Sequence, residues 1–242
     1  MISTAVIILI IYFLIGGVAL FFITKKQTEQ QARTSRIKYF SYMIVVSITL
    51  AALYYSRYSA LSLHIIIALI GATEVWRATV NHLKIRLLAG PIYIFIAICF
   101  CLYPIQDNLP IQSLWRIYFY VLVFDGFAQI SGQLFKGKKL APKISPDKSI
   151  SGVIGGMIMC IVTHYLIEHN WSTALLWGAV FSLLALTGDL LASILKRKTG
   201  IKDYSNLIPG HGGILDRYDS YMFLAACIYM LLQLFWIALY FM

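Results

Sequence analysis

The chain has 242 residues, of which 60 % are hydrophobic and only 12 % are charged, and its formal net charge is +10. This composition excludes an ordinary soluble domain. The apolar runs are continuous and do not alternate with polar residues, so they indicate helices, which satisfy every backbone amide internally in lipid. We therefore predict an all-α fold, a polytopic helical membrane protein with about eight transmembrane helices.

Eight apolar runs are candidates for these helices, each of which needs about 20 residues to cross the bilayer. They lie near residues 2–23, 39–55, 60–76, 87–103, 113–132, 150–167, 172–192 and 220–241. The first run lacks a basic leader and ends in Lys25-Lys26, so we expect an uncleaved anchor. We divide the chain into N-terminal transmembrane helices (1–112) and a C-terminal region (113–242) that carries the polar loops.

Basic residues gather in alternate loops. They follow the first, third, fifth and seventh runs and include Lys25, Arg33, Arg36, Arg77, Lys84, Lys136, Lys139, Lys143, Lys196 and Lys202. The intervening loops hold almost none, with Arg57 as the exception. The positive-inside rule then places both termini outside and the charged loops in the cytoplasm, beside the anionic headgroups of an inner or cytoplasmic membrane. We expect membrane lipids and no nucleic acid as partners, because a soluble basic fold is missing.

Polar residues inside the apolar runs include Asp125, Glu74 and His64. Asp125 stands between Phe124 and Phe127 in the fifth run, where an ionisable side chain indicates a functional role. Glu74 precedes Arg77 by three residues and is interpreted as half of an interfacial ion pair. His64 is interpreted as a structural residue.

The seventh run ends in a polar segment that predicts a metal site. Asp189 and Ser193 share a helix face, and Lys196 follows within one turn. Asp216 lies beyond a glycine-rich loop, so two carboxylates at facing helix ends can close on one cation. Oxygen ligands beside phosphate-binding cations favour Mg²⁺. The alternative is that Asp189 pairs with Lys196 or Arg197 while Asp216 caps the last helix.

Two other groups of residues suit phosphate. The amides of Gly212 and Gly213, with the helix that follows, can form an anion cradle. Lys202 and Arg217 can neutralise charge on a transferring phosphoryl group. A cluster suited to phosphate oxygens precedes the sixth run and consists of Ser145, Lys148 and Ser149. Each feature alone also fits a turn or a headgroup contact, and His211 alone fits a structural role equally well.

The order and spacing of these residues resemble the phosphatidate cytidylyltransferases, also called CDP-diacylglycerol synthases. The first matching stretch is Ser193-Ile-Leu-Lys196-Arg197, then Lys202-Asp203, then Pro209-Gly-His211-Gly-Gly213-Ile-Leu-Asp216-Arg217-Tyr-Asp219. The second is Asp125-Gly-Phe-Ala128, then Ile144-Ser145-Pro146-Asp147-Lys148-Ser149, then Gly152 and Gly155-Gly156. The chain departs from the family at Ser151 and Ala192, where a glutamate is usual.

The resemblance implies roles for individual residues. Asp189 and Asp216 would bind Mg²⁺, with room for a second cation. The residues expected to act in catalysis are Lys202, Asp203, His211, Arg217 and Asp219. Those expected to bind substrate are Asp125, Ser145, Lys148, Ser149, Ser193, Lys196, Arg197, Gly212 and Gly213.

The implied reaction joins CTP and phosphatidate to give CDP-diacylglycerol and pyrophosphate, with attack of the lipid phosphate on the α-phosphorus of CTP. Three alternatives stay open at this point: a CTP-dependent polyprenol or phytol kinase, a divergent paralogue with another lipid phosphate substrate or none, and a transporter with Asp125 and Asp189 in an ion pathway. Acyl-chain preference, the choice between CTP and dCTP, and the oligomeric state are not specified by the sequence; a homodimer is one of the expected states.

Overall fold

The computed structural model describes residues 28–107, 109–210 and 212–240, together with scattered positions between 7 and 25. The predicted run 2–23 therefore lies largely outside the described residues, and His211 lies outside them as well. The described part is built from long helices joined by short connections. They are α2 (Glu29–Tyr55), α3 (Arg57–Thr79), α4 (Leu83–Leu102), α5 (Gln112–Phe135), α6 (Ile150–Glu168), α7 (Trp171–Lys198) and α8 (Leu215–Tyr240).

Six of these helices are long and apolar enough to cross a membrane, namely α2, α3, α4, α6, α7 and α8. The predicted run 113–132 does form a helix, α5, but α5 is not among the six. It carries Arg116 and Asp125 in its sequence, and nine residues from Leu114 to Phe124 are buried. Burial by the neighbouring helices replaces lipid around much of α5. The all-α, multi-pass membrane fold is thus confirmed.

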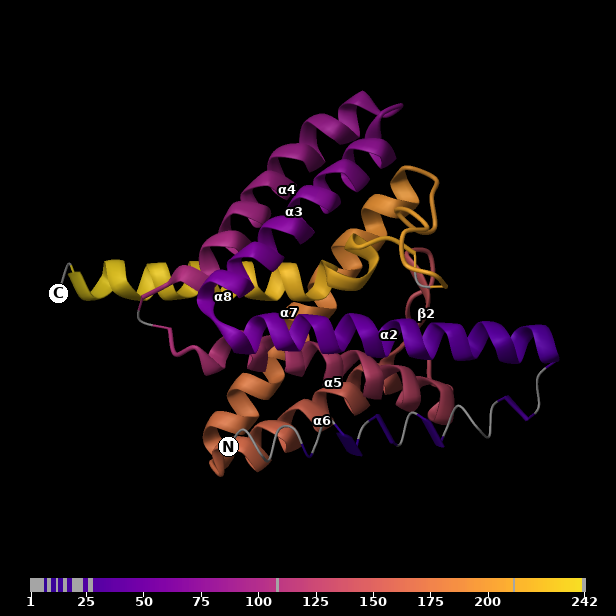
Figure 1. Ribbon diagram of the computed structural model, residues 1–242, viewed down its shortest axis with the longest axis horizontal. Coiled ribbons are helices and arrows are strands. Elements are labelled where there is room, and N and C mark those ends of the chain that lie inside the picture. Colours follow the sequence, from indigo (N-terminus) through magenta and orange to yellow (C-terminus); the bar gives the residue numbers. More distant parts are fainter. Residues whose placement is uncertain are drawn as a thin grey trace.

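The helices alternate in direction, so their connections fall into two groups (Figure 1). The start of α2, the α3–α4 turn, the α5–α6 connection and the α7–α8 loop lie towards the right of Figure 1. The α2–α3 junction, the α4–α5 segment and the α6–α7 turn lie towards its left. The loops rich in Lys and Arg are those of the first group, so the tertiary structure gathers them at one end.

Glycines allow the helices that carry the polar loops to pack closely. A Cβ on Gly152 would lie 2.6 Å from the backbone oxygen of Ala128, and one on Gly156 would lie 2.8 Å from that of Phe124. The glycines of α6 noted in the family motif therefore bring α6 against α5. Gly178 does the same for α7 and α6, where a Cβ would lie 2.7 Å from Ile161 Cα.

Hydrogen bonds between distant helices satisfy polar groups inside the apolar core. His64 of α3 is fully buried and bonds the oxygen of Phe100 and the hydroxyl of Tyr221, each at 2.8 Å. The structural interpretation of His64 is confirmed. Arg57, the exception to the charge pattern, donates to the backbone oxygens of Pro104, Gln106 and Leu109. It therefore holds the turn after α4, which includes a short 3₁₀ helix (Tyr103–Ile105).

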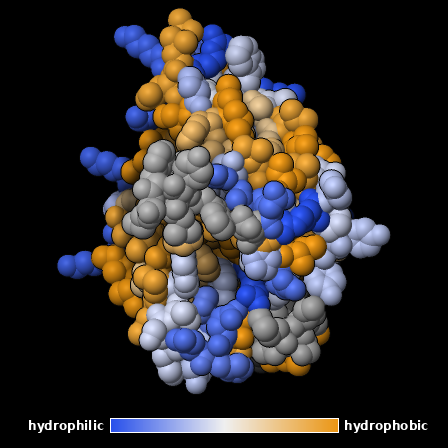
Figure 2. Space-filling view, turned by 90° about the vertical axis from the view of Figure 1, so that its left-hand side faces the viewer, coloured by the Kyte–Doolittle hydropathy of each residue, from blue (hydrophilic) through white to orange (hydrophobic). Residues whose placement is uncertain are grey.

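Large apolar side chains also cover much of the exterior. Leu69, Leu87, Leu88 and Leu234 are among the exposed ones. Seen from the side in Figure 2, hydrophobic residues spread over much of the visible face and hydrophilic residues gather in patches between them. An apolar exterior is expected where the solvent is lipid.

The α5–α6 connection forms a small antiparallel hairpin. Strand β1 (Lys139–Ala141) pairs with β2 (Ser145–Ser149), and the register places Lys139 opposite Ser149. Ser149 then becomes the N-cap of α6, because its hydroxyl accepts a hydrogen bond from the amide of Gly152 at 3.1 Å. The hairpin thus passes directly into α6 at the end that carries the polar loops.

Candidate functional site

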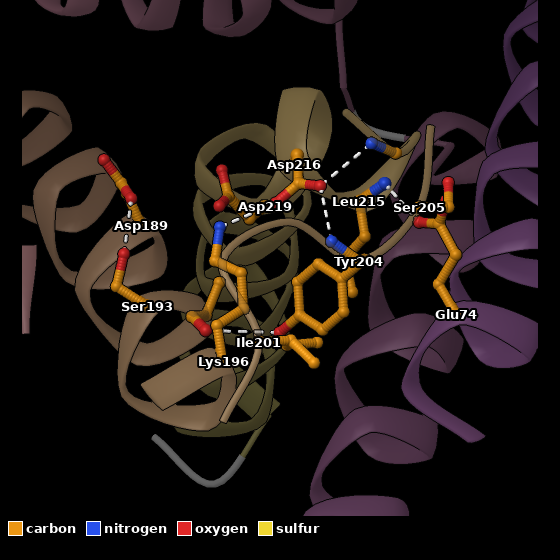
Figure 3. A network of polar contacts seen from close by, with 12 residues as sticks. Glu74, Asp189, Ser193, Lys196, Ile201, Tyr204, Ser205, Leu215, Asp216 and Asp219 are labelled. Atoms are coloured by element: carbon orange, nitrogen blue, oxygen red, sulfur yellow. Dashed lines mark hydrogen bonds and ion pairs between the residues drawn. The ribbon is translucent and has the colours of Figure 1, made fainter. Parts of the chain in front are cut away.

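The polar residues at the end of α7 lie on one helix face, as their spacing predicts. Ser193 Oγ donates to Asp189 Oδ1 at 3.2 Å. Lys196, one turn further, is 8 % exposed and points towards the α8 side of the site (Figure 3). These three residues form one wall of the candidate site.

Asp216, in the first turn of α8, faces this wall from across the loop. Its Oδ1 accepts a hydrogen bond from Lys196 Nζ at 2.7 Å. Its Oδ2 accepts the backbone amides of Tyr204 and Gly213, both at 2.8 Å. The carboxylate therefore ties α7 to α8 and also holds two separate parts of the α7–α8 loop.

The hairpin supplies the other cation. Lys148 of β2 forms an ion pair with Asp189 Oδ2. The two aspartates expected to bind metal are therefore each paired with a lysine, and the lysines come from different segments. The alternative pairing of Asp189 with Lys196 or Arg197 is wrong, because Lys196 is bound to Asp216 and Arg197 donates to backbone oxygens. Asp216 is also not the cap of the last helix, because α8 begins one residue before it.

Asp125 and Asp219 belong to the same site. Asp125 of α5 interacts electrostatically with Lys148, Asp189 and Arg217. Asp219 interacts in the same way with Asp189 and Lys196, and Figure 3 places it between Asp189 and Asp216. Three helices, α5, α7 and α8, and the hairpin thus contribute charge to one volume.

A glycine brings α7 and α8 together at this point. A Cβ on Gly188 would lie 2.9 Å from the backbone oxygen of Asp219 and 2.7 Å from Phe223 Cβ. Any larger residue would push the helices apart. The close approach sets Asp189, the next residue of α7, directly beside Asp219.

Arg217 provides an unused donor. Its Nε is buried and has no hydrogen-bond partner among the described residues. A buried guanidinium nitrogen without an acceptor is costly, so a water or an anionic oxygen can bind at this position. Arg217 lies within electrostatic range of Asp125 and Tyr42.

Other predicted residues lie in the hairpin, at the end of α7 and in the α7–α8 loop. Arg197 is exposed and donates to the oxygens of Ile144 and Ile201, which fastens the hairpin to the α7–α8 loop. Lys202 and Asp203 are exposed in that loop, and Ser145 is partly buried where β2 begins. Ser149 is 4 % exposed and caps α6.

The glycine pair shapes the loop beside α8. Gly212 has a φ of +84°, which favours glycine, and its oxygen accepts the amide of Ile208 at 2.8 Å. The amide of Gly213 is already bound by Asp216. Tyr204, in the same loop, donates its hydroxyl to the oxygen of Ala192 at 3.2 Å, and burial raises the pKa of this phenol, so it remains a donor.

Glu74 also contacts the α7–α8 loop, a position that the sequence pattern did not predict. Its carboxylate is 2 % exposed and accepts hydrogen bonds from Ser205 Oγ at 2.6 Å, the Ile214 amide at 3.0 Å and the Leu215 amide at 2.7 Å. The interpretation as an ion pair with Arg77 is wrong, because the described residues include no such pair. The signal was present: Glu74 is the only acidic residue of α3, and an acid in an apolar run indicates a function.

The donors available for a metal are carboxylate oxygens. Asp216 accepts three hydrogen bonds, and a carboxylate has about four acceptor positions. Among the residues that the structure describes, no group of three or more His, Cys, Asp and Glu side chains is arranged to enclose a metal ion. Mg²⁺ needs no such enclosure, because it binds through one or two carboxylates, waters and substrate phosphates. Asp189 and Asp216 fit that requirement if their lysines move to phosphate.

Comparison with known proteins points to one family. Residues 1–235 match the model of the cytidylyltransferase family. A phosphatidate cytidylyltransferase of Rickettsia prowazekii is 34 % identical over 217 residues, which cover 82 % of this chain and 93 % of the relative. The enzyme of the same name from Bacillus subtilis is 35 % identical over 151 residues, covering 59 % of this chain and 56 % of that protein. This chain belongs to the cytidylyltransferase family.

Proposed function

We propose that the protein transfers a cytidylyl group from CTP to phosphatidate, giving CDP-diacylglycerol and pyrophosphate. The observation that carries the proposal is the convergence of Lys148, Lys196 and Arg217 with Asp189 and Asp216 at one end of the helix bundle. Relatives that span most of this chain carry the name of that activity.

The cations reduce the repulsion between the two anionic reactants, which is the main obstacle to the reaction. A phosphate oxygen of the lipid forms a bond to the α-phosphorus of CTP while the bond to pyrophosphate breaks. Both reactants are anions, so positioning and charge neutralisation matter more than a strong base. Arg217 Nε can donate to a phosphate oxygen, and Lys148 and Lys196 can turn from their aspartates to the triphosphate.

We propose Mg²⁺ as the cofactor, held by Asp189 and Asp216. When bound, it would neutralise phosphate charge and orient the triphosphate. In the structure each aspartate is paired with a lysine, whose ammonium group carries the kind of charge that a metal ion would supply. Exchange of lysine for metal would leave each lysine free for phosphate oxygens.

We also propose that the site opens to the cytoplasm of an inner or cytoplasmic membrane. Support comes from the positive-inside rule together with the basic loops of the described residues, which gather at one end (Figure 1). CTP is then available from the cytoplasm, and phosphatidate enters from the adjoining leaflet. A homodimer stays a prediction, to be checked by light scattering of the protein in detergent.

The experiment is an assay with radiolabelled CTP, phosphatidate and Mg²⁺ on detergent-purified protein. Wild type is compared with Asp189→Asn and Asp216→Asn, and with Glu168→Gln as a control carboxylate. Glu168 pairs with Arg116 at the opposite end of α6. We expect a lipid-extractable cytidine product that both aspartate variants lose and the control keeps.

The same assay separates the alternatives. Cytidylyl transfer releases pyrophosphate, whereas a CTP-dependent kinase releases CDP and leaves no cytidine on the lipid. Absence of lipid-linked cytidine from folded wild-type protein, over several lipid phosphates and divalent ions, would overturn the proposal. None of the contacts described above favours the kinase or the transporter.

A further inference from the structure

Glu74 is a buried carboxylate far in sequence from the signature loop that it contacts. Its three donors are the Ser205 hydroxyl and the amides of Ile214 and Leu215, which lie 131 to 141 positions away. Figure 3 shows Glu74 reaching from α3 to the loop on the side opposite α7. No lysine or arginine forms an ion pair with it in the described part of the chain, so these donors provide its charge compensation.

The contacts of Glu74 fix the start of α8. Leu215 is the first residue of that helix, and the free amides at a helix N-terminus favour a negative charge. The loop has no room for a side chain there, because a Cβ on Gly213 would lie 2.8 Å from Glu74 Cδ. The carboxylate therefore determines where Asp216 and Arg217, the next two residues, stand.

Glu74 and Asp216 hold the same two parts of the loop from opposite sides. Asp216 binds the amides of Tyr204 and Gly213, while Glu74 binds Ser205 and the amides that follow Gly213. Each carboxylate thus links the first part of the loop to the last part. With Glu74 removed, Asp216 would be the carboxylate left to link the two parts of the loop, while it also has to hold Lys196 or a metal.

Resting on the proposed function, we propose that Glu74 is a positioning residue of the transfer reaction. It anchors Ser205, Ile214 and Leu215 to α3. Asp216 and Arg217 then present their side chains to the substrate phosphates and Mg²⁺. Glu74 touches backbone amides and a serine rather than reacting atoms, so it acts through these two residues. The N-terminal helices thereby take part in catalysis through one side chain.

The test compares Glu74→Gln with Ser205→Ala and with Glu168→Gln as the matched control. The amide of Gln has the shape of the carboxylate but presents a donor to one of the backbone amides. Loss of a residue that orients a metal ligand typically costs about 10- to 100-fold in activity or metal affinity. We expect Glu74→Gln to lower kcat by about that factor and to raise the Mg²⁺ concentration for half-maximal rate, at a temperature well below its unfolding transition.

Ser205→Ala removes one of the three bonds and should shift both quantities in the same direction by less. Glu168→Gln should lower thermal stability and leave the Mg²⁺ dependence unchanged. If Glu74→Gln has the same kcat and the same Mg²⁺ dependence as wild type, the proposal is overturned. If Glu74→Gln does not fold, Ser205→Ala decides, because it keeps both backbone contacts; an unchanged Mg²⁺ dependence there would also overturn it.

A second readout does not depend on activity. Hydrogen exchange of the backbone amides in 204–215 should accelerate in Glu74→Gln and remain as in wild type in Glu168→Gln. Unchanged exchange would show that Glu74 does not anchor the loop. If wild type makes no lipid-linked cytidine, the proposed function fails, whereas the exchange experiment still tests the anchoring separately.

Discussion

Lys196 and Asp216 are joined by a hydrogen bond of 2.7 Å between Nζ and Oδ1, and the Asp216 side chain is only 1 % exposed. The pair links the end of α7 to the start of α8 across a loop of sixteen residues, 199–214. In sequence the two residues are 20 positions apart. Removing either partner of such a buried ion pair leaves the other charge unpaired and lowers the stability of the protein.

Lys196→Met should destabilise the protein strongly, because Asp216 would remain buried without its cation. Breaking a buried pair costs about 3–5 kcal/mol. Thermal unfolding in detergent measures the effect, and Lys198→Met is the matched control, since Lys198 is exposed two residues further along α7. An unchanged melting temperature in Lys196→Met would show that the Lys196–Asp216 pair does not stabilise the protein. Adding Asp216→Asn should restore part of the loss.

Gly188→Ala should separate α7 from α8 and disturb the site. The new methyl group would lie 2.7 Å from Phe223 Cβ and 2.9 Å from the oxygen of Asp219. Overpacking of this kind costs about 1–3 kcal/mol, and activity should fall with it because Asp189 and Asp219 move apart. The control is Gly90→Ala, since a Cβ at Gly90 meets nothing within 4 Å. Equal effects of the two substitutions on melting temperature and product formation would refute this account.

His64→Leu should lower stability through unsatisfied partners rather than through lost volume. The buried hydroxyl of Tyr221 and the oxygen of Phe100 would lose their hydrogen bonds, and each unsatisfied group costs about 1–3 kcal/mol. A double-mutant cycle with Tyr221→Phe isolates the pair. We expect the combined loss to be smaller than the sum of the single losses, as judged by melting temperatures. Additive losses would mean that the two side chains do not interact.

Arg197→Gln distinguishes a structural role from direct substrate binding. In the structure Arg197 fastens the hairpin to the loop through the oxygens of Ile144 and Ile201. Hydrogen exchange in residues 139–149 should therefore increase, and activity should fall several-fold. Charge-assisted hydrogen bonds contribute roughly 1.5–3 kcal/mol, and solvent screening reduces this energy at an exposed side chain. Lys198→Gln is the control. A loss of activity without faster exchange would instead show that Arg197 contacts the substrate.

Local features of the sequence predicted much of the molecule. Apolar runs predicted the helices because continuous apolar segments in lipid fold as helices, and the described residues contain seven of the eight expected helices. The i, i+4 spacing of Asp189 and Ser193 predicted their hydrogen bond. Charge in alternate loops predicted that those loops share one end, as Figure 1 shows.

Only the tertiary structure decided which residues are partners. The spacing in the sequence suggested Lys196 as a partner of Asp189. The crossing of α7 and α8 instead places the ammonium group of Lys196 at Asp216, and Asp189 pairs with Lys148. Glu74 lies 140 residues from Ile214, so no local pattern links them. Secondary structure depends on neighbours along the chain and can be read from it, whereas the pairing of buried charges depends on how helices cross.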